Sequence, residues 1–211
     1  FAGVLRFRSA LAAALRVQRV GCAGGAFGGL GLSNTGRVDH ATMKSVATLR
    51  FKEASKRAHR LFAMSSAVWA KEWAENARDD FISDLFEFAS YAYDLADLID
   101  LRDGDVDISK GGAIHLSKAP WPYETDYRRC LNAIRHATSL NFLNANAPSG
   151  RRLFVENENV MLAAVVVSTS RHRGFRVVPI FALSFAFLQH VRPRALSWIA
   201  SGDVQPAKPK S

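Results

Sequence analysis

The chain has 211 residues, of which 48% are hydrophobic and 22% are charged. This composition is close to the globular average, so it excludes a wholly disordered chain, and the length suits one domain with tails. The two cysteines, Cys22 and Cys130, lie in segments of different character and have no partner at metal-ligand spacing. They argue against a disulfide framework and favour a reducing compartment, so we expect a cytoplasmic protein with no metal or other cofactor.

The formal net charge of +9 is divided into three blocks of alternating sign. Residues 1–60 carry eleven basic and two acidic residues, 61–126 carry five and fourteen, and 127–211 carry twelve and three. One interpretation is that the acidic and basic blocks neutralise each other within the fold. The other is that the basic C-terminal part contacts phosphates. We favour the first, because runs of charge usually lie on solvated faces.

Residues 1–42 are rich in Arg, Ala and Gly, and three interpretations compete for them. A mitochondrial-type transit peptide is Arg-rich and poor in acidic residues. A phosphate-binding loop at 21–36 would need a Lys-Ser/Thr pair after its last glycine, which is missing. We favour a flexible or non-native leader, since Met43 looks like a natural start. A single α+β domain is then expected over 43–200, followed by a disordered tail at 201–211.

Two long helices are predicted at 43–70 and 72–101, where apolar residues recur with a period near 3.6. The polar face of the first is basic and that of the second is acidic, and the second is expected to be broken once. A short link between them suggests an antiparallel pair. Residues 102–123 are expected to form a loop. Its Asp-x-Asp-x-Asp run lacks the glycine and glutamate of a calcium-binding EF-hand, so no metal site is predicted there.

A third helix is predicted over 127–139, with Thr125 or Asp126 as its N-cap. Its core-facing residues would be Tyr127, Leu131, Ile134 and Ala137. The composition of 144–152 predicts a turn or loop.

The C-terminal part changes to a β-type pattern. The segments richest in Val, Ile and Phe are 153–155, 160–168 and 175–183. Residues 171–174 read as a hairpin turn with Gly174 at positive φ. The apolar stretch 177–191 is too short for a typical membrane span and predicts a buried strand that runs into a helix. The predicted fold is therefore α+β: two long paired helices plus a third, followed by a small antiparallel β-hairpin or sheet.

The third helix also carries the candidate site. Arg129, Asn132 and His136 are spaced i, i+3 and i+7, and Arg128 makes a similar stripe with the last two. An arginine suits phosphate oxygens, an imidazole suits proton transfer, and an amide can orient either group. The catalytic candidates are Arg129, Asn132 and His136. The phosphate-binding candidates are Arg128, Arg135, Arg171 and Arg173.

Arg129 and His136, with six residues between them, resemble the Arg-x(4–6)-His signature of the HEPN superfamily (higher eukaryotes and prokaryotes nucleotide-binding). The resemblance covers 43–142 and implies a small helical protein of a group that includes metal-independent ribonucleases acting as dimers. It implies that Arg129 and His136 promote attack of a ribose 2′-hydroxyl on the adjacent phosphate at a dimer interface. The superfamily usually has Asn, Asp or His after its arginine, where this chain has Cys130. The stretch 130–137 also resembles an Asn-x-Ile-x-His-Ala helix of uncharacterised bacterial proteins.

Two functions stay open at this point. The first is a non-catalytic interaction or self-association module. The second is a HEPN-like ribonuclease or nucleic-acid-binding protein. The expected partners are a second copy of the chain and RNA, and no membrane is expected as a partner.

Overall fold

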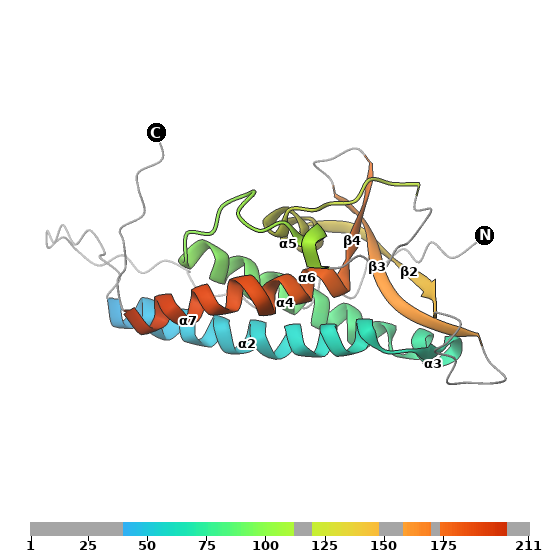
Figure 1. Ribbon diagram of the computed structural model, residues 1–211, viewed down its shortest axis with the longest axis horizontal. Helices are drawn as coiled ribbons and strands as arrows, with labels where there is room; N and C mark the ends of the chain where they lie inside the picture. The colour runs from blue at the N-terminus through green and yellow to red at the C-terminus, as the bar shows by residue number, and fades with distance from the viewer. Residues whose placement is uncertain (1–39, 112–119, 148–157, 170–173, 202–211) are drawn as a thin grey trace, which may run out of the picture. The chain divides into compact units, whose positions relative to one another are not determined.

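The computed structural model describes four stretches of the chain, all within a unit that begins at Val38 (Figure 1). They are residues 40–111, 120–147, 158–169 and 174–201. The predicted leader up to residue 39 and the predicted tail from residue 202 lie outside them.

Two long helices pack against each other as an antiparallel pair. They are α2 (His40–Ser66) and α4 (Arg78–Leu98), and the short helix α3 (Lys71–Asn76) precedes α4. Arg50 of α2 forms an ion pair with Asp94 of α4. Arg57, which lies nearer the C-terminal end of α2, forms one with Asp84. As the residue number increases along α2, the number of its partner on α4 decreases, so the two helices run antiparallel. The prediction of a paired second helical stretch with one break is confirmed, and the break lies at Ala77.

The contact between these helices alternates small and large side chains. Ala54 and Ala58 of α2 are fully buried, and so are Phe81 and Phe88 of α4. The alanines let the two backbones approach, and the phenylalanines fill the space beside them. The ring of Phe88 also meets that of Phe187, a residue of the C-terminal helical layer, edge to face at 5.5 Å between centroids.

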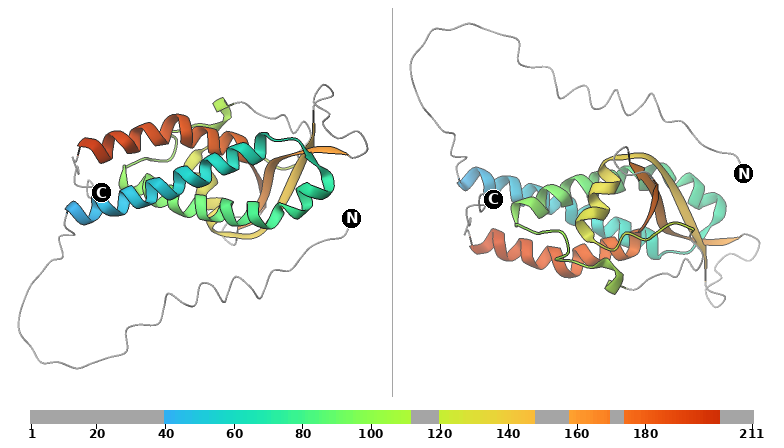
Figure 2. Two further views of the ribbon diagram at one scale, coloured as in Figure 1. Left: turned by 90° about the horizontal axis from the view of Figure 1, so that it is seen from below. Right: turned by 90° about the horizontal axis from the view of Figure 1, so that it is seen from above.

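That C-terminal layer is one helical run that lies along α2 (Figures 1 and 2). It consists of α6 (Ile180–Ala186), the π-helical turn η3 (Phe187–Val191) and α7 (Arg192–Ser201). In the wide turn, the Arg192 N–H donates to the Phe187 carbonyl, five residues back. Pro193 explains this turn, because proline has no N–H to give and its ring clashes with the carbonyl four residues earlier.

Among the described residues, four antiparallel strands form the sheet, and the α+β fold class is thereby shown. They are β1 (Trp69–Ala70), β2 (Ala137–Asn146), β3 (Asn159–Thr169) and β4 (Phe175–Pro179). β3 is central: β2 pairs along one side of it, and the short β1 and β4 share the other. β4 leads directly into α6 at Pro179, which confirms the predicted strand that runs into a helix.

The two faces of the sheet pack against different parts of the chain. Leu162 and Val165 of β3 face the main core, where Phe142 of β2 meets Phe81 edge to face at 5.4 Å between centroids. Ala164 and Val166 belong to a smaller cluster on the opposite face. This alternation is that of a strand with two buried faces, and β3 accordingly reads as a nearly continuous apolar run.

Several of the predicted boundaries are wrong. The first helix is predicted to extend to residue 70, but α2 ends at Ser66 and Trp69–Ala70 form β1. Two further differences lie around α5 and β2. The third helix, α5 (Tyr127–Arg135), stops four residues before the predicted end at 139, and residues 144–146 form strand rather than loop. Pairing with β3 explains both differences, because β2 has a backbone partner on β3 along most of its length. Thr138 and Ser139 also hydrogen-bond to Ser168. Tertiary pairing of this kind overrides local propensity.

Other local predictions are confirmed, and some fall outside the described residues. Asp126 caps α5, since its carboxylate accepts the Arg129 N–H at 2.8 Å. Gly174 has φ of 132° immediately before β4, a conformation that favours glycine. The predicted strand at 153–155 and the rest of the hairpin turn at 171–173 lie outside the described residues.

We predict that Asp126→Ala lowers the free energy of unfolding by about 1–2 kcal/mol, the usual cost of removing a helix N-cap. The substitution also removes the acceptor for the Gly104 N–H, so the loop before α5 loses an anchor. Urea unfolding of the full chain measures the change. Ser90→Ala, at an exposed position of α4, serves as the control and should change stability by less than about 0.5 kcal/mol. Equal effects of the two substitutions would contradict this role of Asp126.

Candidate functional site

Helix α5 carries the predicted catalytic residues and is anchored by one apolar side. Tyr127, Cys130, Leu131 and Ile134 are fully or almost fully buried, so the remaining side of the helix faces outward. Arg129 and His136 both lie on the exposed part, and Asn132 is half-buried between them. Helical spacing in the sequence therefore placed Arg129 and His136 correctly on the solvent-facing side of α5. His136 is the C-cap of the helix and does not lie within it.

The three catalytic candidates are not gathered at one point within a single copy. The seven residue steps from Arg129 to His136 correspond to a rise of about 10 Å between their Cα atoms, at about 1.5 Å per step of α-helix. The Arg129 side chain is 62% exposed, and its Nε lies 3.6 Å from the Asp103 carboxylate, in the loop after α4. The backbone carbonyl of Asn132 accepts the backbone N–H of His136 at 3.1 Å, so this bond belongs to the helix and does not involve the amide or imidazole side chains. A shared substrate would thus have to bridge the two ends of α5 or be completed by another molecule.

Arg128, a phosphate-binding candidate, is held by groups of the chain itself. Its guanidinium donates to the Asp97 carboxylate at 2.6 Å and to the Leu101 carbonyl at 2.6 Å. It also lies over the Tyr93 ring, 4.7 Å from the centroid, and its side chain is only 15% exposed. These contacts tie α5 to the end of α4, and a phosphate would have to displace them.

Arg135 shares the same aromatic ring. Its guanidinium lies 4.3 Å from the Tyr93 centroid and 3.9 Å from the Asp94 carboxylate. Arginine over an aromatic face gains cation–π energy while its planar group remains half-hydrated. The other two phosphate-binding candidates, Arg171 and Arg173, lie outside the described residues.

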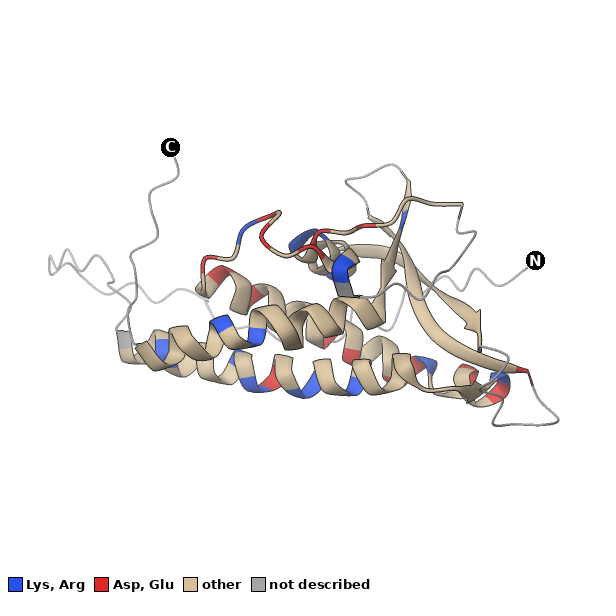
Figure 3. Ribbon diagram, in the orientation of Figure 1, with Lys and Arg blue, Asp and Glu red and all other residues tan. Residues whose placement is uncertain are grey.

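Ion pairs join described residues of the alternating charge blocks across the fold, and Figure 3 shows where the charged residues lie along the ribbon. Basic residues of α2 pair with acidic residues of α4, and those of α5 pair with α4 and the loop after it. Arg176 and Arg194 of the C-terminal block also pair with acidic residues of the middle block. The cross-element pairs include Arg50–Asp94, Arg60–Asp84, Arg128–Asp97, Arg176–Glu124 and Arg194–Asp105. Of the two interpretations of the blocks, mutual neutralisation is thus directly visible among the described residues.

A buried ionic cluster between α2 and α4 was not foreseen from the sequence. Asp84 is 4% exposed, and its carboxylate lies 3.3 Å from Nη1 of Arg57 and 3.0 Å from Nε of Arg60. Arg57 also pairs with Glu87, on the same face of α4. Burial raises the pKa of Asp84, and the two guanidinium groups oppose that rise. The contacts connect the two long helices, so we read the cluster as structural.

A second polar group is buried beneath α5. The Cys130 thiol lies 3.5 Å from the Glu124 carbonyl oxygen, and the Glu124 carboxylate accepts from Arg176 at 2.8 Å. Burial raises the pKa of both Cys130 and Tyr127 well above their ordinary values. A thiol held protonated in an apolar setting is a poor nucleophile and a poor metal ligand. Across the described stretches, no group of three or more His, Cys, Asp or Glu side chains is arranged to hold a metal ion.

The two edges of the sheet differ in how they are protected. On the β4 side, the Val177 N–H donates to the Pro122 carbonyl and the Glu124 N–H donates to the Val177 carbonyl, each at 3.0 Å. This edge also carries Arg176 and Pro179. Such covering segments, charges and prolines are common devices against unwanted strand pairing.

The β2 edge has none of these devices among the described residues. β2 has β3 as its strand partner on one side, and it ends the strand order on the other. Its ten residues, Ala137–Asn146, include no charge and no proline. Apart from its strand partner β3 and helix α5, which leads into it, the described elements make at most marginal backbone contact with β2. Sequence reasoning missed this edge because it read part of the strand as helix and part as loop.

Comparison of the chain with models of protein families, with curated proteins and with solved structures finds no significant match. Among the helices described, none combines the length and apolar character needed to cross a membrane.

We predict that Asp84→Ala destabilises the fold by about 3 kcal/mol, since it leaves two guanidinium groups at a helix interface without their shared partner. Thermal and urea unfolding measure the change. Glu87→Ala is the matched control: it removes a carboxylate from the same cluster at a position that is 42% exposed, so it should cost about 1 kcal/mol or less. An Asp84→Ala effect no larger than that of Glu87→Ala would refute the structural role of the buried carboxylate.

Proposed function

We propose that the chain is a non-catalytic interaction module that works by self-association. The observation that carries this proposal is the open edge of β2, a ten-residue strand without charge or proline. An exposed edge presents unpaired backbone N–H and C=O groups, which pair readily with another strand. The β4 edge differs, because the segment 122–124 covers it, whereas no described residue covers the edge of β2 in the same way.

The state of the α5 arginines also supports an interaction role over phosphate binding. Arg128 and Arg135 engage carboxylates and the Tyr93 ring within the chain. A phosphate site would need these guanidinium groups to be available, since counterion release by free Lys and Arg supplies most nucleic-acid affinity. We propose a cytoplasmic location for the module, in keeping with the buried free thiol of Cys130.

The expected result is a dimer, with a mass twice the 23.2 kDa of one chain, in sedimentation equilibrium of the full chain. Strand pairing depends on backbone hydrogen bonds, so the dimer should persist in about 1 M salt, where exposed ion pairs are screened. A monomer at every concentration tested would contradict the proposal. Dissociation in high salt would instead point to a charge-based interface.

A second candidate function is a HEPN-like, metal-independent ribonuclease or RNA-binding protein. The observation that favours it is that Arg129 and His136 are exposed and directed away from the core. An imidazole can accept the proton of a ribose 2′-hydroxyl as its oxygen bonds to phosphorus, while the bond to the 5′-oxygen breaks. Arg129 would stabilise the charge on the phosphate, with Asn132 orienting the imidazole. RNA would then be the partner.

The ribonuclease candidate predicts cleavage of labelled RNA by the full chain in EDTA. His136→Ala and Arg129→Ala should each lower the rate at least 100-fold, the range for loss of a general acid–base group or a charge-stabilising donor. Arg102→Ala, which removes an arginine that is 68% exposed in the neighbouring loop, should leave the rate unchanged. Absence of cleavage by the unmodified chain would exclude this candidate.

A further inference from the structure

The ladder between β2 and β3 is regular over only part of its length. The register with β3 shifts between Ala137 and Ser139 and again between Leu143 and Asn144. Between these shifts, residues 139–143 pair one to one with 168–164. A bulge twists a strand and disrupts pairing along it, so an added strand would find its regular template in these five residues.

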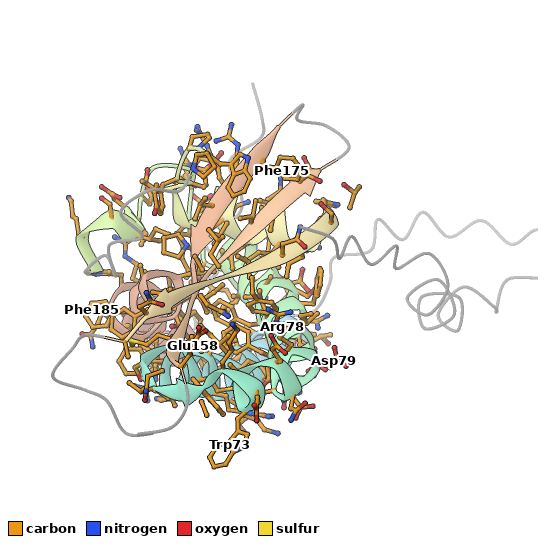
Figure 4. All side chains as sticks on the ribbon, turned by 90° about the vertical axis from the view of Figure 1, so that its right-hand side faces the viewer. Trp73, Arg78, Asp79, Glu158, Phe175 and Phe185 are labelled. Atoms are coloured by element: carbon orange, nitrogen blue, oxygen red, sulfur yellow. The ribbon has the colours of Figure 1, made fainter. Side chains whose placement is uncertain are left out.

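The inner face of this five-residue segment is fixed to the helices. The Phe142 ring meets that of Phe81 of α4, and the Arg78 guanidinium lies 5.8 Å from the Phe142 centroid. Figure 4 shows Arg78 between the helical layer and the sheet. Leu140 packs against the same core. The edge is therefore presented by an anchored strand, and binding to it would require little ordering of the backbone.

The side chains of β2 point to a second copy as the occupant of this edge. Its polar residues are Thr138, Ser139, Asn141, Asn144 and Asn146, and all carry hydroxyl or amide groups. The Thr138 and Ser139 hydroxyls already bond to Ser168, whereas the exposed Asn141 amide both donates and accepts hydrogen bonds and can pair with a copy of itself. When two identical strands pair antiparallel about a twofold axis, only the residue on the axis meets its own copy, and every other residue meets the one equally far on the other side. No such pair along β2 brings two charges together, because the strand carries none. A charged peptide would find no complementary charge on β2.

We propose that two copies of the chain pair antiparallel along β2, with the twofold axis at Asn141, and so join their four-stranded sheets into one of eight. This inference rests on the proposed self-association and adds its partner, surface and register. Asn141 lies at the centre of the regular segment and is exposed. In this register Asn141 faces the partner's Asn141, and Ser139 faces the partner's Leu143.

The register can be tested by disulfide cross-linking in a Cys22→Ser background, with Cys130 buried. Residues opposite each other in antiparallel strands have Cα atoms about 4.5–5.5 Å apart, within the range of a disulfide. Asn141→Cys should therefore give a covalent dimer on mild oxidation. Asn146→Cys is the matched control on the same exposed strand. Its two copies would lie roughly 30 Å apart, because five residues on each side of the axis rise about 3.4 Å each, so it should stay monomeric in a denaturing gel.

The role of the β2 edge as the dimer interface can be tested by introducing a charged side chain on it. Asn141→Lys places two ammonium groups together at the axis and should weaken dimerisation at least 10-fold, measured by sedimentation equilibrium. Ser90→Lys, at an exposed position of α4, should leave it unchanged. Circular dichroism and urea unfolding would verify that both variants fold.

The outcomes separate this inference from the broader proposal. A dimer that survives Asn141→Lys, or that cross-links through Asn146→Cys and not Asn141→Cys, would overturn the β2 register and leave self-association standing. A chain that is monomeric throughout would remove both.

Discussion

The antiparallel pairing of β2 with β3 is the constraint on which the rest of this structure depends. Because the Phe142–Val165 register is set by that pairing, Phe142 reaches Phe81 of α4 and locks the sheet to the helices. The same pairing stops α5 at Arg135, since the following residues are needed in the strand. It also leaves the second edge of β2 with its backbone groups directed away from β3. Fold, helix length and candidate interface thus follow from one ladder of hydrogen bonds.

Electrostatics in the described part of the molecule act mainly within the fold. Asp84 joins α2 to α4, and Asp97 joins α4 to α5 through Arg128. The partners come from different charge blocks, so the strong segregation along the sequence becomes neutralisation in space. An arginine count alone therefore overstated the basic surface available to a phosphate. β2 lies outside this network and has no charged residue, which suits recognition by backbone hydrogen bonds.

Much of the fold follows from patterns that are local in sequence. The periodic apolar stripes of α2 and α4, the Asp126 cap and the positive φ of Gly174 depend on neighbouring residues, and they were predictable. The strand at 137–146 depends on partners that lie from 14 residues away (Asn146 with Val160) to 32 residues away (Ala137 with Thr169). Its serine, threonine and asparagine content resembles a helix end and a turn. The Asp84 cluster was hidden for the same reason, because the acidic face of α4 gave no sign of which carboxylate is buried. The exposure of Arg129 and His136 could be read from helical spacing, whereas the contacts of Arg128 could not.

Amide hydrogen exchange as a function of protein concentration tests the central claim most directly. If two copies meet along β2, amides of 139–143 that point away from β3 should exchange more slowly as the concentration rises and dimers form. Amides of the covered β4 edge should show no such change. Dimer formation without slower exchange in 139–143, or with slowing confined to the helices, would contradict the account.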